Sequence, residues 1–137
     1  MVKSGVILDT NIAIGLLNDN HSIVQTIQNL QDRGYDFYFS VITKCELLSG
    51  VKNDSEWQAV QSIGYNRFID VDNAIATIAG KIRLEQRKEA NRKVKAPDSL
   101  IVATAIHNQY DLLTLDKGMW FAEQYGIKII KVVKENE

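Results

Sequence analysis

Short β-branched or aromatic runs alternate with segments of helical periodicity along the whole chain, and this alternation is the strongest constraint on its fold. The pattern predicts strands at 5–9, 36–41, 67–71, 111–115 and 127–133, and helices at 11–17, 21–33, 42–50, 55–64, 72–90, 97–107 and 117–126. Because helices separate the strands, the strands should pair in parallel through crossover connections. The sequence therefore predicts an α/β fold, a three-layer helix-sheet-helix sandwich around a central, mostly parallel sheet of about five strands.

The size and composition of the chain fit one domain, which we expect over residues 1–137. The chain has 137 residues, 45% of them hydrophobic, and neither a repeat nor a Gly/Ser/Pro-rich stretch marks a linker. Its single cysteine, Cys45, cannot form an internal disulfide. No apolar run has the length of a signal peptide or a membrane span. These features favour a cytoplasmic protein without a membrane partner.

Acidic residues follow the predicted strands where a parallel sheet binds ligands. Asp9 ends the first strand, Glu46 lies in the first turns of the helix after the second strand, and Asp116 follows the fourth. Asp98 opens the helix before the fourth strand, so its place at the same edge depends on the loop preceding that helix. Ligands bind outside the carboxyl ends of parallel strands, and we expect these acids to converge there.

Each of these acids also has an ordinary structural explanation. Asp9 and Asp98 could cap or neutralise helix N-termini, and Asp116 could serve the turn before Gly118. Glu46 could be a solvated helix residue, although the apolar residues around it in the sequence indicate partly buried surroundings.

Taken together, the acids point to a metal. Crowded carboxylates raise one another's pKa unless a cation lies among them. Oxygen ligands suit Mg2+ or Mn2+, and such an ion can activate water for attack on a phosphodiester. Cys45, His21 and His107 lack the spacing of a zinc site. For His107, near the end of its helix, a contact with the helix C-terminus is the simpler interpretation.

Four stretches resemble, in order, the successive signatures of PIN-domain ribonucleases. They are ILDTNIAI with Asp9, SVITKCELLSG with Glu46, PDSLIVATAI with Asp98, and DLLTLDKG with Thr114 and Asp116. The resemblance spans Val6 to about Val133 and is nearest to the toxin subunit of VapBC toxin–antitoxin pairs.

This resemblance implies a metal-dependent endoribonuclease that is the toxin of such a pair. The catalytic and metal-binding residues would be Asp9, Glu46, Asp98 and Asp116. Thr10, Asn11 and Thr114 match positions that support these ligands, and we expect Thr10 and Asn11 to hold Asp9 in place. Many relatives carry an Asp-Phe pair after the last acid, where this chain has Lys-Gly-Met-Trp, so Asp116 would serve alone.

The resemblance also implies the partners. These are an RNA substrate, for which transfer RNA is one candidate, a second copy of the chain in a homodimer, and a small VapB-like antitoxin that enters the catalytic cleft. For the large side chains Trp57, Tyr65, Trp120 and Phe121, core packing is the first expectation. An apolar antitoxin groove between the early helices is the alternative.

A basic stretch precedes Asp98 although the chain as a whole has a formal net charge of -1. Residues 81–95 hold seven Lys or Arg against Glu85 and Glu89, so they carry +5 and the rest of the chain -6. One interpretation is a solvated helix face paired with these two glutamates. The other is contact with RNA phosphates, because an acidic site by itself repels RNA. The candidates for that contact are Arg83, Arg87, Lys88, Arg92, Lys93 and Lys95.

Two other functions stay open at the level of the residues. A metal-dependent phosphatase with an aspartyl nucleophile would also place an acid at Asp9, but it usually has a second acid where this chain has Asn11. A catalytically silent α/β module that binds RNA or a partner is the alternative outside enzymes, and the presence of all four acids disfavours it.

Overall fold

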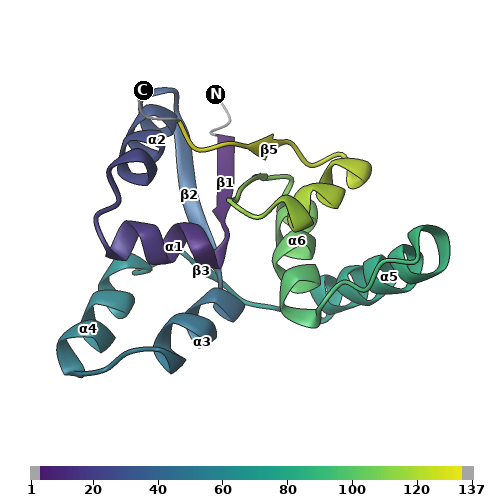
Figure 1. Cartoon of the computed structure of the whole chain (residues 1–137), viewed down its shortest axis with the longest axis horizontal. Coiled ribbons are helices and arrows are strands. Elements are labelled where there is room, and N and C mark those ends of the chain that lie inside the picture. Colours follow the sequence, from purple (N-terminus) through teal and green to yellow (C-terminus); the bar gives the residue numbers. More distant parts are fainter. Residues whose placement is uncertain (1–3, 134–137) are drawn as a thin grey trace.

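The computed structural model describes residues 4–133, which form five parallel strands with helices on both faces (Figure 1). The elements are β1 (Ser4–Leu8), α1 (Thr10–Leu17), α2 (His21–Asp32), β2 (Tyr35–Ser40), α3 (Val41–Ser49), α4 (Asp54–Ile63), β3 (Phe68–Ile69), α5 (Asn73–Ala90), α6 (Ala96–Asn108), β4 (Asp111–Leu113), the 3-10 helix η1 (Lys117–Tyr125) and β5 (Ile129–Ile130). The predicted α/β sandwich is confirmed, and every strand pair among these elements is parallel.

The order of the strands places β1 at the centre of the sheet. This order is β3-β2-β1-β4-β5, so the chain adds strands first on one side of β1 and then on the other. Val6 of β1 lies opposite Phe37 on β2 and opposite Asp111 on β4. Such a change of direction leaves a crevice at the carboxyl ends of the central strands, where ligands bind. Asp9 is the first residue after β1 and therefore lies at this point.

The edge strands are shorter than the sequence predicts. β3 keeps two residues of the predicted 67–71, and β5 keeps two of the predicted 127–133. An edge strand has a neighbour on one side only, so alternating apolar residues do not by themselves extend its hydrogen-bonded ladder. The helix predicted at 117–126 forms as the 3-10 helix η1.

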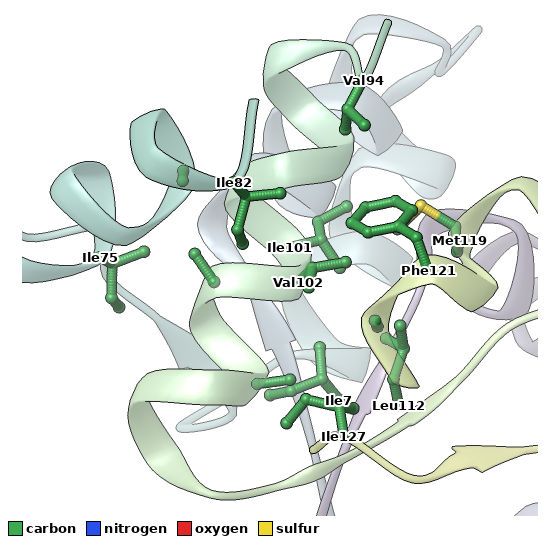
Figure 2. Packing of buried hydrophobic residues seen from close by; sticks show 14 residues of the cluster. Ile7, Ile75, Ile82, Val94, Ile101, Val102, Leu112, Met119, Phe121 and Ile127 are labelled. Carbon is green, nitrogen blue, oxygen red and sulfur yellow. The ribbon is translucent and has the colours of Figure 1, made fainter. Parts of the chain in front are cut away.

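The two faces of the sheet enter two separate cores, because successive side chains of a strand point to opposite faces. Ile7 and Leu112 lie in the cluster covered by α5, α6 and η1, which Figure 2 shows from close by. Val6, Leu8 and Leu113 lie in the cluster covered by α1 to α4. Both faces of the central strands are therefore fully buried, which makes the sheet a rigid base for the loops at its edge.

Helix α5 packs against the core through one face, on which Ile75, Ala79, Ile82 and Gln86 are buried. Val94, on the loop after α5, is also buried, and its side chain points into the same cluster (Figure 2). This loop runs back along α5 toward the start of α6 (Figure 1).

A span across a membrane needs a long apolar helix, and residues 4–133 contain none.

Candidate metal centre

Asp9 is fixed between the ends of two neighbouring strands. Its side chain is 5% exposed. Its Oδ2 accepts a hydrogen bond from Thr114 Oγ1 at 2.7 Å, and its Oδ1 accepts one from the backbone N–H of Thr10 at 2.8 Å. Its own N–H donates to the carbonyl of Leu113 at 3.0 Å. The carboxylate is therefore held in one orientation at the carboxyl edge of β1 and β4.

Asp9 occupies the N-cap position of α1, as the capping interpretation expects, but its side chain departs from the usual capping contact. A capping side chain accepts from the second or third N–H of its helix, as Asn20 does from Ile23 at the start of α2. Asp9 accepts instead from the first N–H of α1, that of Thr10. Burial raises the pKa of Asp9, and although the hydrogen bonds from Thr114 and Thr10 oppose this shift, the charges of Asp116 and Glu46 raise the pKa further.

Asp98 does not cap its helix, although it lies in the first turn of α6, where a carboxylate favours the helix dipole. Lys95 is the N-cap residue of α6, and no side chain caps that helix. The half-buried carboxylate of Asp98 makes no hydrogen bond or ion pair with another residue in the described part of the chain. Burial is the main cause that raises its pKa, followed by the charges of Asp9, Asp116 and Glu46, and Lys95 alone opposes them. The acids from four chain segments therefore gather closely enough to repel one another.

Glu46 reaches the site from α3 and is exposed, so the expectation of partly buried surroundings is wrong. The next residue, Leu47, turns into the core and is 7% exposed, because adjacent helix residues point in different directions. Glu46 Oε1 accepts a hydrogen bond from Thr10 Oγ1 at 2.6 Å, and the same hydroxyl lies 2.9 Å from Thr43 Oγ1. The sequence reasoning missed Thr43. Its position three residues before Glu46, on the same helix face, is the signal that could have found it.

Asp116 has the turn role that its sequence context predicts. Its Oδ1 accepts a hydrogen bond from the N–H of Gly118 at 2.8 Å, and its own N–H donates to Thr114 Oγ1 at 3.0 Å. Thr114 thus connects two of the acids, Asp9 and Asp116. Asn11 accepts from the N–H of Leu115 through Oδ1 at 3.3 Å. Thr114 and the backbone of Thr10 hold Asp9, whereas the Thr10 side chain orients Glu46 and Asn11 fastens the loop after β4.

The donor set fits a hard divalent cation, because it consists of carboxylate oxygens whose charges are not compensated by the protein. With their side chains as placed, no three acidic, histidine or cysteine residues within 4–133 are close enough to enclose a metal ion. Binding would therefore require the carboxylates to rotate toward one another. Asp98 has no hydrogen bond to break in such a rotation.

The six basic candidates all lie exposed on α5 and on the loop that follows it. Pairing with the glutamates of α5 is not observed, since no Lys or Arg of residues 81–95 forms an ion pair within the described part of the chain. Glu85 accepts a hydrogen bond from Tyr125 Oη at 3.1 Å instead. His107 lies in the last turn of α6, near the helix C-terminus, and is exposed.

The large side chains divide between core and surface. Core packing is confirmed for Phe121, which is 3% exposed, and it is wrong for Trp57 and Tyr65, which are 42% and 76% exposed. A groove of about 520 Å³ lies between α1, α3 and α4. Its lining includes Ile14, Leu17, Leu47, Val60 and, at its polar side, Glu46. An apolar groove therefore adjoins the acidic cluster.

A sequence profile of the PIN domain family matches residues 6–127, and the chain belongs to this family. PIN domains are generally nucleases. A comparison with curated protein sequences finds no match.

Solved structures with the same fold come from several bacteria. A chain in the crystal structure of FitAcB from Neisseria gonorrhoeae is 26% identical with a TM-score of 0.70, over 90% of this chain and 95% of that one. A chain in a toxin–antitoxin complex from Klebsiella pneumoniae is 25% identical with a TM-score of 0.71, over 91% and 95%. VapBC2 from Rickettsia felis, bound to a DNA fragment from its promoter, contains a chain that is 21% identical with a TM-score of 0.76, over 94% and 99%. At that last identity the likeness concerns the fold alone.

Proposed function

We propose that this protein is a metal-dependent endoribonuclease and the toxin of a toxin–antitoxin pair. The observation that carries the proposal is the gathering of Asp9, Glu46, Asp98 and Asp116 at one edge of the sheet, where burial, and then the charges of the other acids, raise the pKa of Asp9 and Asp98. Membership of the PIN domain family supports nuclease chemistry. The similar chain in the Klebsiella pneumoniae toxin–antitoxin complex supports the toxin role.

The four acids would hold Mg2+ or Mn2+, with Asp9 as the most rigid ligand because β1 and Thr114 fix it. When bound, such an ion supplies an activated water and offsets the negative charge that develops on the phosphodiester. Thr10 keeps Glu46 turned toward the site through its 2.6 Å hydrogen bond. Asp98 adds a carboxylate that forms no hydrogen bond or ion pair in the described part of the chain. No nucleophilic side chain is required for hydrolysis in this arrangement.

The substrate class in this proposal is RNA, with transfer RNA as one candidate. The supporting observation is the exposed and unpaired basic set of α5 and its following loop, which precedes Asp98 in the chain. Cationic side chains beside an acidic centre supply the phosphate contacts that the centre cannot make.

The partner in this proposal is an antitoxin. The groove between α1, α3 and α4 presents apolar side chains such as Ile14, which is 47% exposed, and Glu46 lies along the same groove. A segment bound there would cover Glu46 and prevent metal-dependent cleavage. The proposal also includes a homodimer and a cytoplasmic location, which the family resemblance implies.

The test is cleavage of total RNA and bulk transfer RNA by purified, antitoxin-free protein with Mg2+, Mn2+ or EDTA. We expect metal-dependent cleavage that disappears in Asp9→Asn and in Asp98→Asn. The matched control is Asp32→Asn, which removes an exposed carboxylate at the end of α2 and should cleave like the wild type.

Two outcomes would contradict the proposal. Cleavage that persists in EDTA or in both variants would show that these acids are not a metal centre. Intact RNA under every condition, from folded protein free of bound inhibitor, would favour the silent binding module instead.

A further inference from the structure

A second groove lies between α5 and the loop after it. It has a volume of about 440 Å³, which is the size of a ligand site rather than of a gap between side chains. Its lining consists of Gly80, Arg83, Leu84, Arg87, Asn91, Arg92, Lys93 and Val94. This set, called the basic groove below, contains four cationic residues and no acidic one. Figure 1 shows α5 and its return loop projecting from the body of the molecule beyond α6.

The wall that the loop contributes is anchored to the fold. Asn91 ends α5 with a φ of 49°, and the N–H of Arg92 donates to the carbonyl of Gln86 at 3.0 Å. Val94 buries its side chain in the core (Figure 2), and its carbonyl accepts a hydrogen bond from Arg83 Nε at 2.9 Å. The loop is therefore held against α5, and the groove does not depend on a mobile segment.

The cations of the basic groove are available to a ligand. Arg83 uses only Nε within the protein, so its two terminal nitrogens have no acceptor in the described part of the chain. Arg87, Arg92 and Lys93 are exposed and form no ion pair there. Like charges that lie close together without counterions repel one another and destabilise the folded chain. An anionic ligand in the basic groove would reduce this repulsion.

We propose that the basic groove binds the sugar-phosphate backbone of the RNA substrate. This inference rests on the proposed ribonuclease function. A guanidinium group can form bidentate hydrogen bonds with two phosphate oxygens. Three of the four cations in the groove are arginines. Asp98 lies four residues after Val94, so the loop leads from the groove to the acidic cluster.

The proposal narrows the basic residues that matter. Arg83, Arg87, Arg92 and Lys93 line the groove, whereas Lys88 and Lys95 do not. This division was not visible in the sequence, where all six belong to one basic stretch. The matched control uses Lys81 and Lys128, which are exposed, lie outside the groove and are not among the six candidates.

The test measures binding of fluorescein-labelled bulk transfer RNA to the full chain in EDTA, over a range of KCl concentrations. The variant Arg87→Gln/Lys93→Gln removes two groove cations, and Lys81→Gln/Lys128→Gln removes two exposed cations outside it. We expect the groove variant to bind about tenfold more weakly and to lower the slope of log Kd against log salt by about 1.5. The control should change affinity by less than about threefold.

A second readout separates this inference from the function on which it rests. In Mg2+ or Mn2+, the groove variant should raise KM and keep kcat at saturating RNA, because the acids are intact. Asp98→Asn should lose kcat and still bind RNA. If the groove variant binds RNA like the wild type while Asp98→Asn is inactive, the groove inference is wrong and the function stands. Wild-type protein that neither binds nor cuts RNA overturns both.

Two further results would overturn the inference. If both double variants weaken RNA binding equally, the RNA is attracted by the overall positive charge of this region and not by the groove. A change in oligomeric state, measured by light scattering, with RNA affinity unchanged would make the groove an interface between copies of this chain. Circular dichroism checks that the variants fold. If the double variant unfolds, the test is repeated with Arg92→Gln, because Arg92 lies on the loop and forms a hydrogen bond only through its backbone.

Discussion

At the scale of single residues, the Thr114 hydroxyl is the contact that organises the candidate metal centre. It donates to Asp9 Oδ2 and accepts the N–H of Asp116, so one side chain connects two acids that follow neighbouring strands. Thr114 is 3% exposed. A buried hydroxyl that both donates and accepts a hydrogen bond orients a carboxylate better than solvent does. Such supporting contacts strengthen metal binding by the carboxylate.

Thr114→Val tests this contact. The substitution keeps the shape of the side chain and leaves a buried carboxylate oxygen without its donor. We expect about 1–3 kcal/mol lower free energy of unfolding and roughly 10- to 100-fold weaker Mn2+ binding. Urea denaturation and calorimetric titration measure the two effects.

The matched control for this prediction is Thr77→Val, because the Thr77 hydroxyl donates to the Asn73 carbonyl on the exposed side of α5. The control should leave Mn2+ binding unchanged. Unchanged Mn2+ affinity in Thr114→Val as well would show that Asp9 needs no support from this hydroxyl.

At the scale of elements, α5 is attached to η1 by a small polar network that extends from the buried Gln86 to the surface. Gln86 Nε2 donates to Gln124 Oε1 at 3.0 Å and to Tyr125 Oη at 3.3 Å, and Tyr125 Oη donates to Glu85. Gln86 Oε1 is buried without a hydrogen-bond partner. The network therefore orients α5, and with it one wall of the basic groove, but one of its polar atoms is unsatisfied.

Gln86→Met is the prediction at this scale. Methionine fills a similar volume and removes the unsatisfied oxygen, and the exposed Gln124 can bond water instead. We expect the free energy of unfolding to change by less than about 1 kcal/mol. Ile82→Ala, one turn earlier on the same buried face, should lower it by about 2–5 kcal/mol. A loss above about 2 kcal/mol in Gln86→Met, measured by urea denaturation, would show that the amide network stabilises the helix.

At the scale of the whole molecule, the fold gathers negative charge in one place and positive charge in another. The acids come together from the ends of β1 and β4, from the second half of α3 and from the first turn of α6, whereas the basic groove belongs to α5 and its return loop. The apolar groove adjoins the acids at Glu46. In the proposed function, these would be the separate surfaces for a metal, an anionic strand and an apolar segment.

Gathering these carboxylates makes the stability of the metal-free protein depend on pH. Asp9 and Asp98 have raised pKa values in the folded state, mainly because of burial and then because of the other acids. The folded state therefore binds protons more tightly than the unfolded chain, and the stability gained from protonation is lost as the pH rises through the folded-state pKa values. Metal-free Asp98→Asn should melt a few degrees above the wild type near neutral pH, and this difference should shrink as the pH falls toward about 4.

Thermal melts in EDTA across this pH range measure the effect, with Asp32→Asn as the control that lies outside the cluster. Added Mn2+ should stabilise the wild type and not Asp98→Asn. A pH-independent difference between the two proteins would show that repulsion among the acids is not its cause.

Much of the architecture follows from local sequence. Runs such as Val6–Leu8 form strands because their β-branched and apolar side chains suit a sheet buried on both faces. The spacing of Ile75, Ala79 and Ile82 forms a helix that buries one face. These patterns depend on near neighbours in the chain, so the sequence predicted the parallel sandwich and the position of Asp9 at the end of β1.

The tertiary structure alone decided which distant side chains meet. Thr114 donates to an acid 105 residues away, and Thr43 shares the hydroxyl that orients Glu46. The same packing exposes Trp57 and buries Val94. It also places four of the basic residues along the groove and leaves Lys88 outside it. Periodicity fixes which face of an element is apolar, but the rotation and offset of one element against another depend on how all side chains fill the core together. The sequence by itself therefore determined the elements and the acids, and only the packed molecule determined their contacts.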